Sequence, residues 1–480
     1  MLQEILAQYS VPESIQERFY SNLNANLYSD TQRDIRHHLS LNGVNFEGRE
    51  IPISILPTFL NQNEVDRVGV LGGAIRNTLQ KILDRFLEES RSSNIHKPLH
   101  QFFEPYKKWW KLIENEKRSI DPIQLMRFDT IRTDLCAWKI LETNTACPGG
   151  TIHCAKIRDA WLMTRLGHSL LKNQSHVDYE IDSKSSFVLH LVKLAQNKSQ
   201  NKNPNIAVCS YRGSYLNELQ SLQNEHKRLV SLGVLSGGNL LVDDIRNIHC
   251  DGGVAYIQGK PVSIIYNKID PLMIDPSGSQ AAEIQGWLNV VESEQTDFLN
   301  SLGSMYLSEA KRVLALLSDP MWWEYLELDS ETQSALQELV PYTRVLPENK
   351  TSATTEKFLY DLVLNNQERF VLKADSLTRG AGVYIGKNLN NLEWETAISN
   401  TLSTHGVVQS RVETPSRVNV RLSDCTESSL QPFKDFFGID LFYFGDRFVG
   451  PVSRSHSNLV FNVGNGGKES PTLVLQSEKL

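Results

Sequence analysis

The sequence predicts a mixed α/β protein of two or three domains. Two runs with strand-like alternation, residues 128–134 and 138–144, follow a stretch whose apolar residues recur at helical spacing, 65–88. A second α/β pattern lies between 205 and 300, where short buried runs flank a helix. At 480 residues the chain is long enough to bury a large core and to divide into domains.

Composition and charge exclude several functional classes. The apolar fraction of 40% is that of an ordinary globular protein, and the net charge of −7 leaves no basic footprint for nucleic acid. No apolar run is long enough to cross a bilayer, and the N-terminus lacks the pattern of a secretory signal, so we expect a cytoplasmic protein without membrane contact. The six cysteines form no C-x-x-C pair, which favours core thiols over a zinc or redox motif.

The central stretch 127–150 is expected to form a β-hairpin that carries hard oxygen ligands. Pairing of its two strands places Asp129 opposite Glu142, and alternation puts Arg127 on the face of Asp129 and Asn144 on the face of Glu142. Two carboxylates and an amide suit Mg²⁺, which leaves its other positions to water and phosphate. Arg127 could meet a transferring phosphoryl group.

Two alternatives stay open for this stretch. Acidic residues in a hairpin are often a solvated face, and Glu142 could instead pair with a lysine. Pro148-Gly149-Gly150 predicts a sharp turn into a helix over 151–171, whose amino end favours anions. His153, one turn into that helix, is either a substrate contact or a structural histidine.

The element patterns, together with the family resemblance given below, imply four parts of the chain. These are a helical N-terminal region at 1–120, a metal-binding part at 121–200, a small α/β domain at 205–300 and a nucleotide-binding part at 301–480. The polar run 197–204 is the best linker candidate.

Within the later regions the patterns predict further elements. The α/β domain should contain strands at 206–210 and 240–243, a helix at 215–232 and a hairpin at 253–266, and helices are expected at 279–300 and 302–319. Tyr266, Lys268 and Asp270 share a face at a strand end. They point either into a ligand cleft or to the surface.

Residues 370–386 predict a phosphate-covering loop. A strand ends at Lys373, the loop Arg379-Gly380-Ala381-Gly382 follows, and a strand returns at 383–385. Glycines let backbone N–H groups approach anions, and a strand-end lysine neutralises phosphate charge. This is not a P-loop, because no G-K-[ST] follows.

The segment 407–415, V-V-Q-S-R-V-E-T-P, predicts a strand and a looser continuation. Its backbone could face an adenine edge and Glu413 could accept a ribose hydroxyl, or it is an ordinary strand and turn. Farther on, Asn462 and the glycines of 461–467 form either a phosphate or substrate turn or a simple hairpin.

Taken together, these motifs resemble a known family. F-V-L-K with R-G-A-G-V and V-V-Q-S-R-V resemble the nucleotide half of ATP-grasp ligases, and R-F-D with L-E-T-N-T and P-G-G resemble that fold's metal-binding half. Here the metal half comes first, 231 residues before the lysine (373 − 142 = 231). That order is typical of the circularly permuted ATP-grasp group, which includes the synthetase half of glutathionylspermidine synthase.

The resemblance implies a permuted ATP-grasp fold over about 120–480, with ATP and Mg²⁺, two ions by analogy, as cofactors. It implies that Arg127, Lys373 and Arg454 are catalytic and that the metal is held by Asp129, Glu142 and Asn144. The nucleotide contacts that it implies are Lys311, Lys373, Arg379, Gly380, Gly382, Gln409, Val412 and Glu413. Relatives often have an arginine pair where this chain has Asn267-Lys268, which leaves the substrates open.

The implied activity is an ATP-dependent carboxylate–amine ligase that forms an amide or peptide bond through an acyl phosphate. Its partners would be small carboxylate and amine substrates. Two alternatives keep the nucleotide site: a small-molecule phosphotransferase, and a nucleotide-binding scaffold without catalytic activity.

Overall fold

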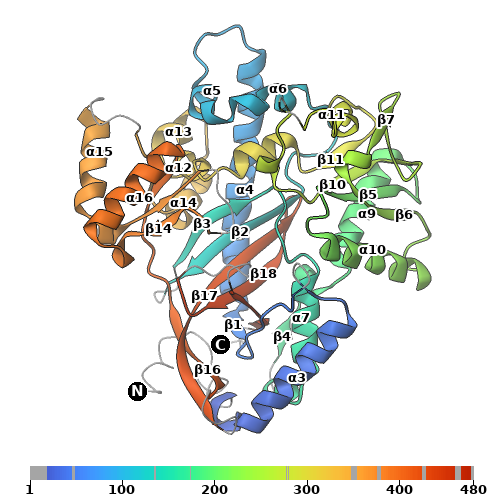
Figure 1. Cartoon of the computed structure of the whole chain (residues 1–480), viewed down its shortest axis with the longest axis vertical. Coiled ribbons are helices and arrows are strands. Elements are labelled where there is room, and N and C mark those ends of the chain that lie inside the picture. Colours follow the sequence, from blue (N-terminus) through green and yellow to red (C-terminus); the bar gives the residue numbers. More distant parts are fainter. Residues whose placement is uncertain are drawn as a thin grey trace.

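A computed structural model describes residues 19–45, 49–133, 137–172, 175–276, 278, 280–347, 354–375, 380–423, 429–459 and 466–476. The described residues form five sheets, with helices packed on and between them (Figure 1). The predicted mixed α/β class is confirmed. In the part described, no helix has both the length and the apolar character needed to cross a membrane.

The central sheet is antiparallel and takes its strands from distant parts of the chain. Its order is β19-β18-β17-β2-β3, and β16 pairs with β17. The strands are β2 (Leu125–Arg132), β3 (Trp138–Asn144), β16 (Ser416–Leu422), β17 (Leu430–Phe444), β18 (Arg447–His456) and β19 (Lys468–Ser470). The predicted β2–β3 hairpin is confirmed. Strands from both sides of residue 301, where a domain boundary was expected, share this one sheet.

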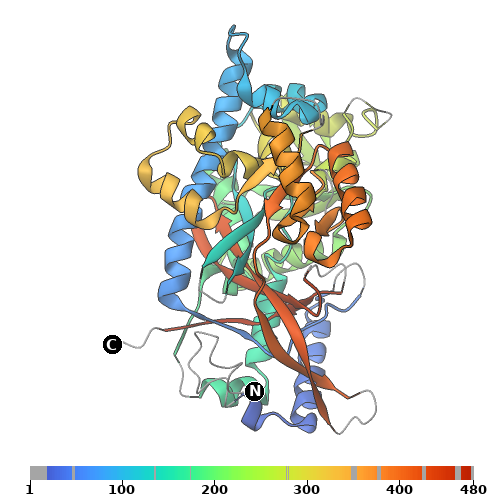
Figure 2. The same ribbon diagram turned by 90° about the vertical axis from the view of Figure 1, so that its left-hand side faces the viewer.

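The helix α4 (Gln62–Arg91) lies across one face of the central sheet, as Figures 1 and 2 show, and confirms the prediction for 65–88. Two of its glycines allow close approach to the strands. A Cβ at Gly69 would overlap the Phe448 ring, and a Cβ at Gly72 would overlap the Tyr443 hydroxyl. That hydroxyl donates to the Gly69 carbonyl over 2.8 Å. Small residues at these two positions therefore set the distance between helix and sheet.

The small α/β unit is built on a parallel sheet of order β11-β10-β5-β6. The predicted strand–helix–strand pattern is confirmed by β5 (Asn205–Ser210), α10 (Leu216–Ser231) and β6 (Asn239–Asp244). The predicted 253–266 hairpin is shorter: β8 (Val254–Ile257) and β9 (Lys260–Val262) pair with each other, and β8 also pairs with β7 (His249–Asp251), whereas β10 (Ile264–Asn267) joins the parallel sheet. α9 (Ser186–Ser199) packs against this sheet.

Two helix predictions after this unit were wrong in part. Within 279–300 only α11 (Gln285–Val291) is an α-helix, and β11 (Asp297–Leu299) is a strand because it pairs in parallel with β10. Within 302–319 a π-helical turn at Ser304–Ser308 and the short α12 (Val313–Leu317) replace one long helix. Lys311 and Arg312 lie in the break between them.

The predicted helix at 151–171 is also divided. α7 (His153–Leu162) ends near Met163, and α8 (Arg165–Leu171) begins anew. The Thr164 side chain caps the second helix by accepting from the Gly167 N–H over 3.0 Å. A threonine that caps a helix end competes with continuous helix at the same position.

A second antiparallel sheet, of order β12-β15-β13-β14, lies beside the central one. Its strands are β12 (Thr343–Val345), β13 (Phe370–Lys373), β14 (Val383–Ile385) and β15 (Val407–Ser410). Figure 1 shows α15 (Thr354–Asn365) and α16 (Asn391–Ser403) covering it. Trp394 of α16 is fully buried in one cluster with Leu372 and Val408, so the sheet has a core of its own.

The remaining elements enclose these layers. A three-stranded mixed sheet, with one parallel and one antiparallel pairing, consists of β1 (Thr58–Asn61), β20 (Thr472–Leu475) and β4 (His176–Val177). Figure 2 shows the β16–β17 ribbon extending away from the body near α3 (Ala25–Leu41). The remaining α-helices among the described residues are α5 (Pro98–Phe102), α6 (Lys107–Asn115), α13 (Pro320–Tyr325) and α14 (Ser330–Leu339).

The neighbouring glycines of α4 should respond oppositely to alanine. Gly72→Ala forces a methyl group against Tyr443, so we expect the free energy of unfolding to fall by about 1–3 kcal/mol. A Cβ at Gly73 would meet no described atom within 4 Å, so Gly73→Ala should raise that free energy by roughly 0.5–1 kcal/mol through helix propensity. Urea denaturation followed by tryptophan fluorescence measures both. Equal effects in the two variants would contradict the packing.

Candidate functional site

The β2–β3 hairpin aligns the predicted ligand residues as expected. Asp129 lies directly opposite Glu142, and Arg127 lies opposite Asn144. A bulge follows Asp129, so the ladder shifts register after the charged residues. The strand order adds a residue that sequence reasoning missed: β17 places Asp440 opposite Asp129. A single aspartate inside the apolar strand F-F-G-I-D-L-F-Y-F was the available signal.

Two arginines and two aspartates form a buried charge network on this sheet. Arg127 Nε lies 2.8 Å from Asp129 Oδ1, and Arg454 contacts Asp129 and Asp440 at 2.7 Å each. The Asn144 amide also donates to Asp129 Oδ1 over 2.7 Å. Burial alone would raise the pKa of the Asp129 carboxyl, but the two arginines outweigh it and hold that pKa at about 2. Asp129 is therefore ionised, and both of its oxygens accept hydrogen bonds.

Glu142 faces a different cation. Lys311 Nζ lies 3.1 Å from Glu142 Oε1, and the glutamate side chain keeps 33% of its surface exposed. The alternative that Glu142 pairs with a lysine thus holds in this structure, with the lysine that the resemblance implied. Beneath them, the missed residue Glu309 accepts from the Ala146 N–H over 2.9 Å, and burial raises its pKa to about 7.

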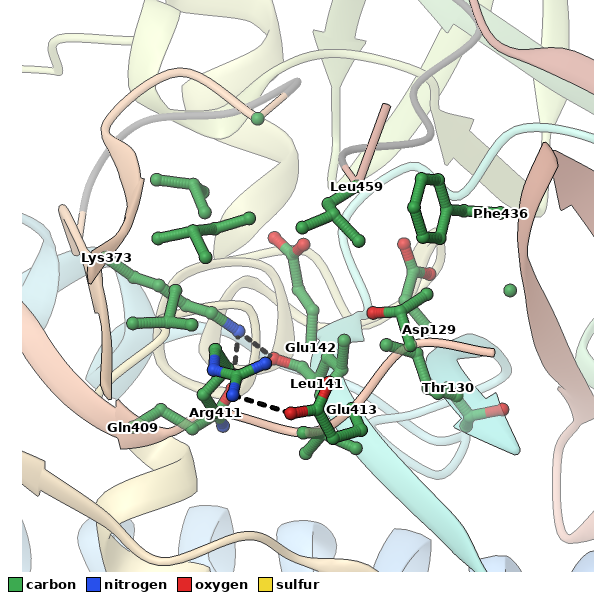
Figure 3. A pocket seen from close by; sticks show the side chains of 18 of the residues that line it. Asp129, Thr130, Leu141, Glu142, Lys373, Gln409, Arg411, Glu413, Phe436 and Leu459 are labelled. Carbon is green, nitrogen blue, oxygen red and sulfur yellow. Dashed lines mark hydrogen bonds and ion pairs between the residues drawn. The ribbon is translucent and has the colours of Figure 1, made fainter. Parts of the chain in front are cut away.

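Lys373 joins the second sheet to the hairpin. Its ammonium donates to the Leu141 carbonyl over 2.6 Å and to Gln409 Oε1 over 2.8 Å (Figure 3). Leu141 directly precedes Glu142, so the lysine-bearing and acidic segments, predicted to meet across the chain, lie in contact. Burial lowers the pKa of Lys373 to about 8, against the opposing effect of Glu142.

A cavity of about 430 Å³ lies between the two sheets, a volume typical of small-molecule sites. The predicted residues that line it are Asp129, Glu142, Lys311, Lys373, Gly380, Gln409, Val412, Glu413 and Arg454. Arg411, within the predicted adenine segment, also lines it, as do residues that were not predicted: Lys387, Lys434, Phe436, Asp440 and Leu459. In Figure 3, Glu142 and Asp129 stand between Lys373 and Phe436.

Three predicted site residues stand apart from the lining. Asn144 donates to Asp129 of the lining, and Arg127 contacts Asp129 and, at 3.7 Å, Asp440. Gly382 lies at the base of the glycine-bearing loop, where its carbonyl accepts from the Ala374 N–H over 2.9 Å. Arg379, and Asn462 of the predicted 461–467 turn, lie outside the described residues.

The predicted adenine segment borders the cavity at its far end. Gln409 is buried, and its amide also donates to Thr343 Oγ1 over 3.1 Å, so its orientation is fixed from two sides. Glu413 is largely exposed and pairs with Arg411 at 2.6 Å. Of these residues, Gln409 is rigidly placed and Glu413 is accessible.

Lys268 of the small α/β unit and His153 of α7, whose roles the sequence left open, lie elsewhere. Lys268 is buried, donates to the Cys147 and Pro148 carbonyls over 3.0 and 2.9 Å, and pairs with Glu218 at 3.2 Å. His153 is also buried, which lowers its pKa to about 4. Neither residue borders the cavity. Lys268 holds the Pro-Gly-Gly turn, and burial raises the pKa of the Cys147 thiol to about 12, which leaves it unreactive at neutral pH.

Comparison with known proteins finds similarity in structure only. No family model matches the sequence, and no curated protein matches it. Among solved structures, a glutathione synthetase-like effector from Globodera pallida in its apo form superposes with a TM-score of 0.57 at 13% identity, over 94% of this chain and 98% of that one. D-alanyl-alanine synthetase A from Vibrio cholerae O1 biovar eltor gives a TM-score of 0.27 at 12% identity, over 49% and 68%. The chain therefore shares its fold with the glutathione synthetase-like effector.

Proposed function

We propose that this protein is an ATP-dependent carboxylate–amine ligase with a circularly permuted ATP-grasp fold. The observation that carries the proposal is the contact of Lys373 with the Leu141 carbonyl, next to Glu142, at the wall of the cavity. The contact joins a cationic strand to an acidic hairpin that precedes it in the chain, the order expected of the permuted fold. The fold shared with a glutathione synthetase-like effector supports a ligase.

The nucleotide would lie in the cavity between the sheets. Lys311 and Lys373 would neutralise phosphate charge, because both are buried cations at its wall. Gly380 and Gly382 have positive φ values of 77° and 69°, a conformation that glycine adopts without strain and that can turn N–H groups toward an anion. Arg379 would belong to the same phosphate-covering loop.

The adenine would contact the other end of the cavity. Residues 409–412 would present their backbone to the ring edge, and Glu413 would accept a ribose hydroxyl. Gln409, held by Lys373 and Thr343, would fix the position of this segment relative to the phosphate end.

The proposed donor set is of the kind that Mg²⁺ prefers. Glu142 borders the cavity, and Asn144, whose amide donates to Asp129 from outside the lining, would add an amide oxygen as a second hard ligand. Asp129 completes the predicted trio, but it would have to exchange hydrogen bonds from arginines for the ion. Among the described residues no group of three His, Cys, Asp or Glu is arranged for a metal, and the proposed trio contains only two carboxylates. The ion would neutralise charge on the phosphates.

The reaction has two displacement steps. A substrate carboxylate oxygen attacks the γ-phosphorus of ATP, the bond to the β-phosphate oxygen breaks, and ADP leaves. The amine nitrogen then attacks the carbonyl carbon of the acyl phosphate, the carbon–oxygen bond to phosphate breaks, and the amine loses a proton. The protein supplies charge neutralisation, alignment and exclusion of water.

Arg127 and Arg454 are suited to the first step. Asp129 and Asp440 hold the two guanidinium groups beside each other. Carboxylates that keep the arginines oriented would pre-organise them for the transferring phosphoryl group.

An ADP-release screen tests the activity. Purified protein with Mg²⁺ and ATP is given amino acids and small peptides singly and in pairs, and mass spectrometry identifies products. We expect ADP and free phosphate to appear together with a joined product only when both members of one pair are present. Transfer of phosphate to a single acceptor would indicate a phosphotransferase, and ATP binding without turnover across the panel would indicate a scaffold.

Glu142→Gln and Asp129→Asn should have different effects, because Glu142 would mainly bind the metal ion and Asp129 would mainly orient the arginines. Glu142→Gln removes a carboxylate from the metal set, so the Mg²⁺ concentration for half-maximal ADP release should rise about tenfold or more. Asp129→Asn removes the carboxylate that Arg127 and Arg454 share and leaves Asp440 to orient them, so kcat should fall by about 100-fold.

Glu180→Gln is the matched control for these variants, because Glu180 is similarly exposed at 34%, pairs with Arg447 and lies outside the cavity. It should behave as the wild type. An unchanged Mg²⁺ requirement in Glu142→Gln would refute its assignment as a ligand.

ATP binding should weaken above pH 8. Lys373 is protonated below its pKa of about 8 and loses its charge as the pH rises through that value. The Kd for ATP should therefore rise by up to about tenfold per pH unit above 8, as expected when one proton must be taken up on binding. Lys373→Gln should bind weakly without this rise. Lys139→Gln, which removes another partly buried lysine outside the cavity, should keep the wild-type profile.

A further inference from the structure

A buried ion pair connects the segment that carries Lys311 to the strand end that carries Lys373. Arg312 Nε lies 2.6 Å from Asp375 Oδ2, and the Arg312 backbone N–H donates to Asp375 Oδ1 over 2.8 Å. The two side chains keep 5% and 2% of their surface exposed. Asp375 thus directs both oxygens to one residue, which fixes its position and direction.

The rest of the guanidinium group binds two further segments. Its NH2 group donates to the His405 carbonyl over 2.9 Å, and its NH1 group donates to the Phe102 carbonyl. All three nitrogens of Arg312 therefore have acceptors, on three separate parts of the chain. A lysine ammonium is a single point charge and cannot reproduce this planar arrangement.

Both partners adjoin a lysine of the cavity wall. Lys311 directly precedes Arg312 and contacts Glu142 at 3.1 Å. Lys373 lies two residues before Asp375, and the Ala374 N–H between them is bonded to the base of the glycine-bearing loop. The Arg312–Asp375 pair therefore links the two segments that carry the cavity lysines. Only a few covalent bonds separate the pair from each lysine.

The backbone around the pair is closely packed. A Cβ at Gly406, next to the bonded His405, would overlap the Lys373 carbonyl oxygen. The packing at this point leaves little space for a displaced Arg312 side chain. A shift of that side chain would therefore be transmitted to its neighbours, as in other packed interiors.

Stability alone is a weak reason for such a pair. Replacing a buried ion pair by apolar residues is often neutral or stabilising, because desolvation offsets the attraction between the charges. What apolar side chains would lose is the fixed direction of three hydrogen bonds.

We propose that Arg312 and Asp375 are positioning residues that set the separation of Lys311 and Lys373 and so shape the site for the ATP phosphates. The inference rests on the proposed ATP site. It assigns to two residues outside the cavity lining a role in triphosphate recognition, with adenosine recognition independent of them.

Arg312→Lys and Asp375→Asn test this assignment. Isothermal titration calorimetry gives the Kd for ATP, competition gives the Kd for adenosine, and thermal unfolding reports stability. We expect the Kd for ATP to rise by about tenfold to 100-fold in both variants, since a misplacement of about 1 Å can cost that much. The Kd for adenosine should stay within about twofold of the wild type. Gln409 would lose at most its bond from Lys373, because its contact with Thr343 and the pairing of β15 with β12 do not involve the ion pair.

Arg158→Lys is the matched control. Arg158 is equally buried at 6% and pairs with Asp178 and Asp182, away from the two lysines. It should lose comparable stability and bind ATP as the wild type does. If Arg312→Lys does not fold, Asp375→Asn decides.

The outcomes are distinguishable. Wild-type protein that binds no ATP overturns the proposed function and this inference together. Wild-type binding with an unchanged Kd in the Arg312 and Asp375 variants overturns the inference alone. Equal weakening of ATP and adenosine also overturns it, because that result indicates a general structural role.

Discussion

The buried ammonium of Lys373 is the constraint on which the site depends. A charged group out of water must find hydrogen-bond acceptors, and Lys373 finds them on the Leu141 carbonyl and on Gln409. The first acceptor belongs to the central sheet and the second to the smaller one, so the two sheets must lie close together at this point. The cavity between them follows from that contact.

The central sheet contains buried negative charges, which likewise need partners of opposite charge. Asp129 and Asp440, on paired strands, would repel each other in a buried setting, and Arg127 and Arg454 compensate them. Burial raises the pKa of Asp440 even so, whereas Asp129, bonded to both arginines, has its pKa held low. The two neighbouring carboxylates thus differ in pKa because their surroundings differ. The same strand face can therefore carry both the fixed arginines and the proposed metal ligands.

Sequence reasoning was most successful where signals were local. Period-two alternation was enough to predict the hairpin and its register from Asp129 to Glu142, and helical spacing was enough for α4. It failed where tertiary pairing decided the outcome, since β11 is a strand because it pairs with β10. The expected helix over 302–319 is instead a π-helical turn and a short α-helix, a break that the local pattern does not indicate. Asp440 and Asp375 were missed because the role of a single acidic residue depends on the position of its partner, which the sequence does not give. The contact of Lys373 with the hairpin was predicted only through resemblance, since no local pattern reports it.

The composition of the central sheet has a consequence for biosynthesis. Arg454 completes the charge network with Asp129, yet 325 residues separate them in the chain. At about 5–20 residues per second, a ribosome needs roughly 16–65 s between these two residues. During that interval the β2 edge of the nascent hairpin, which β17 later covers, has no sheet partner, and an unpaired strand edge invites aggregation. Building one sheet from both halves of a long polypeptide therefore leaves this edge unpaired during most of that interval.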